Sequence, residues 1–194
     1  GIFQWTEVMN IDESEDPIII EVYAKQFAWQ ARYAGADNTL GLGNVNFIDE
    51  TNNPIGVDLS DPASLDDKPV TELHLPKGKK VLFKFRSQDV LHSAYMPHFR
   101  AQMNCVPGMV TQFAFTPKYT TEEMREQSEV MDKTRGINKI RSDKGEDLYE
   151  FDYVLLCNKI CGASHYSMQM KIVVEEEDDY KQWLAEQPTF AEKL

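Results

Sequence analysis

One short segment of this chain combines several soft metal ligands. Residues 157–168 read CNKICGASHYSM, with two thiols, an imidazole and a thioether at Cys157, Cys161, His165 and Met168. Structural zinc sites combine Cys and His without thioethers, whereas sulfur with imidazole selects copper, and a weak Met ligand is typical of copper electron-transfer sites. Two thiolates on one loop could also both bridge a pair of copper ions. The segment therefore predicts a copper site.

His92 is the best candidate for the second imidazole that a symmetrical copper pair would need. It lies in the segment 89–93, DVLHS, which we expect at the end of the strand that carries Phe83 and Phe85. A lone histidine of this kind is more often a hydrogen-bonded structural residue, and His92 becomes a ligand only by pairing with the later loop. The alternative for that loop is a disulfide between its two cysteines, which leaves the ordered Cys, His and Met spacing unexplained.

Composition limits the class of protein. The 194 residues include 20 Lys and Arg against 32 Asp and Glu, which gives a formal charge of −12. This acid excess argues against nucleic-acid binding, which depends on Lys and Arg clusters, and favours a basic protein partner. The length fits one domain with a core. No apolar run approaches the ~20 residues of a membrane span, and the sequence starts at Gly1 without a leader, so we expect any membrane anchor to precede it.

The elements that must position these ligands are mostly strands. Apolar and polar residues alternate in several segments, namely 18–24, 27–33, 73–75, 81–86, 113–115, 149–155 and 168–174. This two-residue period is typical of half-buried strands, and a short helix is expected over 180–187. Many short strands with long connections predict an all-β fold, either a sandwich or a Greek-key barrel.

Two polar segments interrupt the strands. Segment 36–69 is rich in Asn, Asp, Gly and Pro and holds seven acids, so we expect an acidic surface loop. Segment 118–147 is mostly charged and reads as a surface insertion, with a capping box between Thr120 and Glu123 and a helix over 124–133. The expected division of the chain is an N-terminal arm following a membrane anchor, one domain and a C-terminal tail, over 1–17, 18–187 and 188–194.

Taken together, these motifs resemble the copper A domain of subunit II of haem-copper cytochrome c oxidases, in the version found in Bacteroidetes-type bacteria. The resemblance covers about 18–183 and rests on four features: 89–93, the run Val106, Pro107 and Gly108, 157–168, and Trp183. It implies a cupredoxin-like Greek-key sandwich with a short C-terminal helix. It also implies a location on the periplasmic face of the bacterial inner membrane, anchored by preceding transmembrane helices.

The resemblance also implies a role for each ligand. Two bridging thiolates, one imidazole per copper, one thioether and one backbone carbonyl would form a binuclear copper A centre: Cys157 and Cys161, His92 and His165, Met168, and Lys159. Such a domain accepts electrons from cytochrome c or a tethered haem c domain and passes them to the haem of subunit I for dioxygen reduction. The domain by itself would only transfer electrons. The oxidoreductase is the complete oxidase of which it would be a part.

Three features depart from the family pattern, at four positions. Lys159 replaces the usual Glu of a magnesium site, and an ammonium group cannot bind magnesium, so that site is not carried over. Phe27 stands where the family usually has the Trp through which electrons enter, so this role is assigned to Phe27 with the nearby Trp29. Asn104 and Met109 replace the usual Asp and Arg around the Val-Pro-Gly run, so an ion pair toward subunit I would be rebuilt elsewhere.

Other protein classes compete with this interpretation. A structural subunit of a quinol oxidase would lack the copper ligands, and a mononuclear copper carrier would need only one of the two loop cysteines. A copper chaperone would gain nothing from a rigid sandwich. The copper A domain of a nitrous oxide reductase has a very similar loop and normally follows a large propeller domain.

The remaining His, Cys and Met residues are weaker candidates. Cys105 is expected to be a small buried residue, and His74 to be structural. His98 could line the metal site or lie on the surface. Three thioethers would give copper an apolar cover or pack in the core: Met96, Met103 and Met109.

Overall fold

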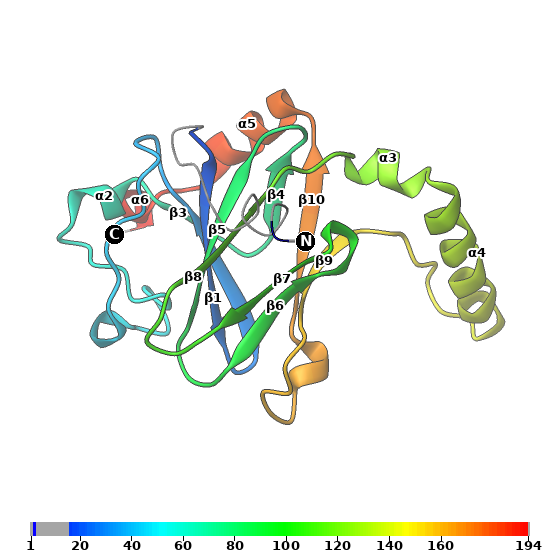
Figure 1. Cartoon of the computed structure of the whole chain (residues 1–194), viewed down its shortest axis with the longest axis horizontal. Coiled ribbons are helices and arrows are strands. Elements are labelled where there is room, and N and C mark those ends of the chain that lie inside the picture. Colours follow the sequence, from blue (N-terminus) through cyan, green and yellow to red (C-terminus); the bar gives the residue numbers. More distant parts are fainter. Residues whose placement is uncertain (1, 3–15, 194) are drawn as a thin grey trace.

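The computed structural model of the chain describes residue 2 and residues 16–193, so the expected N-terminal arm, 1–17, lies almost entirely outside the described residues. Two five-stranded sheets form the body of the molecule (Figure 1). The first sheet contains, in spatial order, β3 (Lys68–Val70), β2 (Ala28–Tyr33), β1 (Ile18–Lys25), β5 (Val81–Ser87) and β8 (Thr111–Phe115). The second contains β4 (Leu73–Pro76), β10 (Gln169–Glu175), β9 (Tyr153–Cys157), β6 (His92–Met96) and β7 (Ala101–Cys105).

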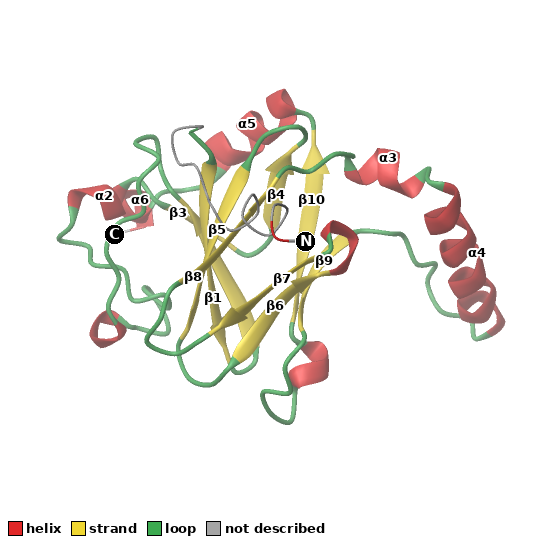
Figure 2. Ribbon diagram, in the orientation of Figure 1, coloured by secondary structure: helices red, strands yellow, loops and turns green. Residues whose placement is uncertain are grey.

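The core lies between the two sheets, as the strand periodicity predicts. In β1 the alternating residues Ile20, Val22 and Ala24 are fully buried, and Phe83 of β5 packs in the same core. The pairs β1 with β5 and β10 with β4 are parallel, whereas the other pairs are antiparallel. The predicted all-β, cupredoxin-like sandwich is confirmed (Figure 2).

The strand that carries His92 is a correction to the sequence prediction. His92 does not end the strand of Phe83 and Phe85, which is β5 in the first sheet. Instead it begins β6 in the second sheet, after a turn in which the Ser87 hydroxyl donates to the Val90 carbonyl. The sequence of β6, HSAYM, has no clear two-residue alternation, whereas β7, AQMNC, alternates over only five residues and was not predicted.

Segment 36–69 is more than the acidic surface loop that was predicted. It contains η2 (Val45–Phe47) and α2 (Pro62–Leu65), and it ends in the edge strand β3. Ile55 and Val57 are buried in a second small core with Tyr23 of β1 and Phe190. One of the seven acids, Asp67, is fully buried. The segment therefore covers the outer face of the first sheet.

The C-terminal residues also join this layer. Helix α5 (Glu177–Glu186) packs near β4, and the short helix α6 (Phe190–Lys193) lies in the segment expected to be a tail. The backbone N–H of Phe190 donates to the Asp67 carbonyl at 3.0 Å. Phe190 thus fastens the end of the chain to segment 36–69.

The charged insertion projects from the sandwich as a helical arm (Figure 1). Its first helix, α3 (Thr121–Arg125), begins with the predicted capping box between Thr120 and Glu123. The helix is interrupted at 126–127, and α4 (Ser128–Asp143) follows. This second helix is longer than the predicted helix over 124–133. Among residues 2 and 16–193, no helix is long and apolar enough to cross a membrane.

Candidate metal centre

Two neighbouring strands bring the first thiol and the first imidazole together. Cys157 is the last residue of β9, and it pairs with Ala94 of β6, two residues after His92. As a result, Cys157 Sγ lies 3.8 Å from His92 Nδ1. The sheet itself, through the register between β6 and β9, sets this distance between residues that are far apart in the sequence.

The loop after β9 supplies the remaining side chains. Cys161 Sγ lies 3.8 Å from Cys157 Sγ, 3.7 Å from His165 Nδ1 and 4.0 Å from Met168 Sδ. His165 begins the 3-10 turn η4 (His165–Ser167), and the Cys157 N–H donates to the Met168 carbonyl at 3.1 Å, which closes the loop. The three cysteines, all in the described part of the chain, are free, so the disulfide alternative is not found.

The Lys159 carbonyl points toward the cysteines, while its side chain is exposed. The carbonyl oxygen accepts from Cys157 Sγ at 3.2 Å. All the donor atoms of the ligand set implied by the family resemblance thus lie at one end of the second sheet, where β6 begins and where the loop between β9 and β10 projects at the bottom of Figure 1.

The cluster is buried, and its donor atoms are soft. His92 and Met168 are buried, and both loop cysteines are at most 9% exposed. Burial, together with the hydrogen bond to Cys157 and the charge of Cys157, raises the pKa of the Cys161 thiol to about 11. A bound metal ion deprotonates coordinating thiols and would supply the missing positive charge. Two buried thiols, imidazoles and a thioether together fit a soft metal ion, and copper above all.

Asp89 orients His92. Its carboxylate Oδ1 lies 2.9 Å from His92 Nε2, and this hydrogen bond requires the imidazole proton on Nε2. The Nδ1 atom is then free to face Cys157 and bind a metal ion. Burial tends to raise the pKa of Asp89, but hydrogen bonds from the Gln26 and Val90 N–H groups and from His92 lower it below its ordinary value. Asp89 was predicted only as part of the motif 89–93, and its position three residues before His92 was the signal for this contact.

The two aromatic residues assigned to electron acceptance differ in exposure. Phe27 is half-buried at the surface, between β1 and β2. Trp29 is only 6% exposed, and its ring lies 6.2 Å from that of His92 in an edge-to-face arrangement. The Trp29 indole N–H donates to the Met168 carbonyl at 3.3 Å. Trp29 therefore supports two ligands from beneath, and only Phe27 reaches the surface.

The weaker candidates fall into three groups. Cys105 is buried opposite His92, in the register of β6 with β7, and burial raises the pKa of its thiol to about 12. His98 lies beyond the other end of β6, against Phe151 and Tyr153, so it does not line the cluster. His74 stacks on the Trp183 ring at 3.9 Å, as expected for a structural residue. Of the thioethers, Met96 is buried at the far end of β6 and Met109 is 56% exposed.

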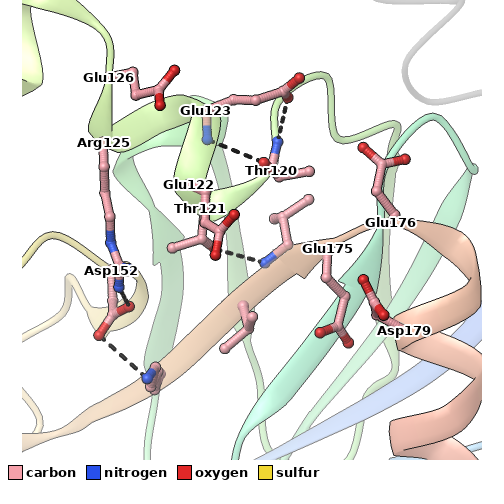
Figure 3. Close-up of a pocket in the computed structure, with 13 residues that line it drawn as sticks. Thr120, Thr121, Glu122, Glu123, Arg125, Glu126, Asp152, Glu175, Glu176 and Asp179 are labelled. Carbon is pink, nitrogen blue, oxygen red and sulfur yellow. Dashed lines mark hydrogen bonds and ion pairs between the residues drawn. The ribbon is translucent and has the colours of Figure 1, made fainter.

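A separate cavity of about 440 Å³ lies among α3, β10 and the start of α5. Figure 3 shows Glu122, Glu175 and Asp179 around it, and most of the charged residues that line it are acids. The part of β10 that lines the cavity runs from Lys171 to Glu175, and no Cys, His or Met residue of the cluster lines it. The cavity is therefore not part of the metal site.

The fold and the donor set together define a cupredoxin-like copper domain. Comparison with known sequences then identifies the family: residues 18–134 match the family model described as the periplasmic domain of cytochrome c oxidase subunit II. The chain belongs to the cytochrome c oxidase subunit II family, and it corresponds to the part of that subunit on the periplasmic side of the membrane.

Individual relatives agree with this assignment. The chain is 37% identical over 193 residues to the alternative cytochrome c oxidase subunit 2 of Bradyrhizobium diazoefficiens, covering 98% of this chain and 58% of the relative. It is 24% identical over 182 residues to cytochrome c oxidase subunit 2 of Alkalihalophilus pseudofirmus, covering 91% of this chain and 36% of the relative. The chain thus spans little more than half the length of the first relative and about a third of the second.

A solved structure supports the fold. The crystal structure of the periplasmic domain of subunit II of cytochrome oxidase from Bradyrhizobium japonicum matches with a TM-score of 0.50 and 17% sequence identity. The match covers 87% of this chain and 91% of that chain. At this level of identity the likeness concerns the fold alone.

Proposed function

We propose that this chain is the electron-transfer domain of a cytochrome c oxidase. It would accept electrons from a cytochrome c or a tethered haem c domain at a binuclear copper A centre and pass them to the haem of subunit I, where dioxygen is reduced. The observation that carries this proposal is the symmetry of the cluster. Two thiols lie 3.8 Å apart, and each has its own imidazole Nδ1, at 3.8 and 3.7 Å.

Each ligand has a place in this proposal. The centre would be held by two bridging thiolates, two imidazoles, a thioether and a backbone carbonyl, from Cys157 and Cys161, His92 and His165, Met168, and Lys159. When bound, the copper pair supplies a one-electron redox centre whose charge is shared by two ions. The residues of the chain hold the donor atoms in fixed positions and keep water away, because four of the five ligand side chains are buried.

The mononuclear carrier explains the cluster less well. A single copper with one thiolate would leave the other cysteine without a role, although Cys161 lies next to both His165 and Met168. Family membership favours an oxidase over a nitrous oxide reductase. Titration of the metal-free, reduced chain with copper tests the proposal: we expect two coppers per chain and a purple oxidised protein. One copper with a blue colour, or none, would contradict it.

The surface around the ligands suggests how an electron donor docks. Ile160 and Tyr166 of the ligand loop are 87% and 86% exposed, and Leu91 beside His92 is about half exposed. Such an apolar rim suits a donor that docks briefly over the metal centre by excluding water. The acidic run 175–179 begins at the end of β10 that is further from the ligands. Part of segment 36–69 lies nearer the ligands, because Glu50 forms a salt bridge with Lys25 at the end of β1.

Electron transfer from a basic cytochrome c is expected to slow as salt is raised. A net charge of −12 steers a basic donor, and such steering speeds association by ~10- to 10³-fold. We expect the lower end, about tenfold, because Asp67 is buried and the 175–179 acids lie further from the ligands than the ~8 Å screening length at ~0.15 M salt. Stopped-flow rates across a salt series measure this. A rate that does not change with salt concentration would mean that the acidic residues play no role in the association with the donor.

Phe27 is the surface residue that we assign to electron acceptance. Its half-buried ring contacts the ligand loop at Gly162, so it offers a short path from the surface to Cys161. Phe27→Ala is expected to slow electron transfer at high salt, where charge no longer steers the donor. The same stopped-flow assay measures the rate. An unchanged rate would place the docking site elsewhere on the domain.

Met168 is expected to tune the centre more than to hold it. Weak thioether ligands mainly set the reduction potential of copper sites, so Met168→Leu should retain two coppers and shift the potential. The side chain is 2% exposed and Leu has a similar volume, so the free energy of unfolding should change by less than ~1.5 kcal/mol. Voltammetry and metal analysis of the variant measure both effects. Complete loss of copper, or an unchanged potential, would argue against this role.

A further inference from the structure

Gln26, in the turn between β1 and β2, touches both halves of the metal site. Its backbone N–H donates to Asp89 Oδ2 at 2.7 Å, and the other oxygen of that carboxylate holds His92. Its side-chain amide donates to the backbone carbonyl of Cys161. One residue therefore joins the turn before β6, which carries one ligand, to the loop after β9, which carries the others.

The turn fits closely against the ligand loop. Gly162, directly after Cys161, has a φ of +146°, which residues with a side chain rarely adopt. A Cβ at this position would lie 2.8 Å from two carbons of the Phe27 ring and 3.0 Å from Gln26 Nε2. The absence of a side chain at Gly162 thus lets Gln26 reach the Cys161 carbonyl.

We propose that Gln26 is a positioning residue for the metal centre, which fixes the Cys161 backbone relative to the Asp89–His92 pair. The proposal rests on the binuclear centre described above. In the described part of the chain, the other hydrogen bonds that join this loop to its surroundings lie at its two ends, from the Asn158 N–H to the Ser93 carbonyl and from the Trp29 indole to the Met168 carbonyl. Without the Gln26 amide, the Cys161 thiolate in the middle of the loop can therefore shift relative to His92. Groups that orient metal ligands typically change metal affinity by 10- to 100-fold when they are removed.

Because of where Gln26 lies, substitutions of it can test metal positioning without lowering the stability of the fold. Its side chain is exposed, so its loss removes no core packing. Exposed Gln112, the second residue of β8, provides a control of the same residue type outside the ligand loops. Gln26→Leu keeps a similar size but has no donor. Gln26→Glu keeps the length of the side chain and replaces the amide donor with an acceptor.

The test is a competition for Cu(I) between the metal-free chain and a chelator of known affinity, with the absorption spectrum of the oxidised, copper-loaded protein as a second readout. Gln26→Leu and Gln26→Glu should both bind Cu(I) ~10- to 100-fold more weakly than Gln112→Leu, with shifted spectra and unchanged urea midpoints of the metal-free proteins. Affinity and spectrum equal to those of Gln112→Leu would overturn the proposal.

Failure of the positioning role and failure of the binuclear function give different results in this test. If the unmodified chain binds fewer than two coppers, the binuclear function fails, whatever the variants do. If the unmodified chain binds two coppers, a Gln26→Glu protein with unchanged Cu(I) affinity and spectrum overturns the positioning role alone. The reason is that a carboxylate cannot donate a hydrogen bond to the Cys161 carbonyl. Should Gln26→Leu not fold, the near-isosteric Gln26→Glu decides between the two results.

Discussion

Cys157→Ser is expected to abolish the binding of two coppers. Cys157 Sγ lies within 4 Å of His92 Nδ1, of Cys161 Sγ and of the Lys159 carbonyl, so it is the donor that links the two halves of the cluster. A serine hydroxyl remains protonated near neutral pH and is a poor ligand for copper, so neither half would keep its bridge. Metal analysis of the purified, reconstituted variant measures the loss.

Cys105→Ser is the matched control. This third cysteine is fully buried and pairs with His92 across β6 and β7, yet among the described residues its thiol forms no hydrogen bond with the proposed donor atoms. Two coppers should therefore remain bound in Cys105→Ser. Two coppers in Cys157→Ser, or their loss in Cys105→Ser, would mean that the bridging thiolates have been wrongly assigned.

Arg32→Met is expected to lower the free energy of unfolding by ~3–5 kcal/mol. The Arg32 guanidinium is almost fully buried and donates to Glu21 at 2.7 Å, to Asp67 at 2.6 Å and to the Gly41 carbonyl at 2.7 Å. Glu21 keeps a second partner in Arg86, but Asp67 would lose the ion pair with Arg32, the one ion pair found for it among the described residues. Burial already raises the pKa of Asp67 to about 7, despite the opposing effect of Arg32. Urea unfolding monitored by fluorescence measures the change.

The control for this prediction is Arg135→Met on α4. Arg135 also forms an ion pair, with Asp132 at 3.1 Å, but both side chains are more than 70% exposed. Exposed pairs contribute ~0–1 kcal/mol, so this variant should unfold close to the unmodified chain. Equal losses in the two variants would show that burial of the Arg32 network is not what makes it stabilising.

The candidate site was predictable from the sequence because most of its ligands follow one another in a single loop. Their spacing is set by the loop, so residue types at fixed intervals carried the chemistry without knowledge of the fold. His92 was identified by its type but placed on the wrong strand. The register between β6 and β9, which brings it to Cys157, is a long-range property with no local signal.

The layer outside the first sheet could not be predicted in the same way. Arg32 alternates with apolar residues and reads as a solvent-facing position, yet it is 1% exposed. Two-residue periodicity reports only that a strand has two different faces. It cannot reveal that a polar segment such as 36–69 folds over the outer face and pairs its buried charge with that strand. The Gln26 contacts escaped prediction for the same reason, because they join three segments distant in sequence.

The electron paramagnetic resonance spectrum of the oxidised, copper-loaded chain tests the central claim most directly. If one unpaired electron is shared equally by two copper nuclei held by Cys157 and Cys161, the hyperfine pattern must contain more lines, with smaller spacing, than a single copper nucleus can produce. We predict this shared pattern, with two coppers per chain. The pattern of one isolated copper nucleus would contradict the binuclear centre and support a mononuclear carrier.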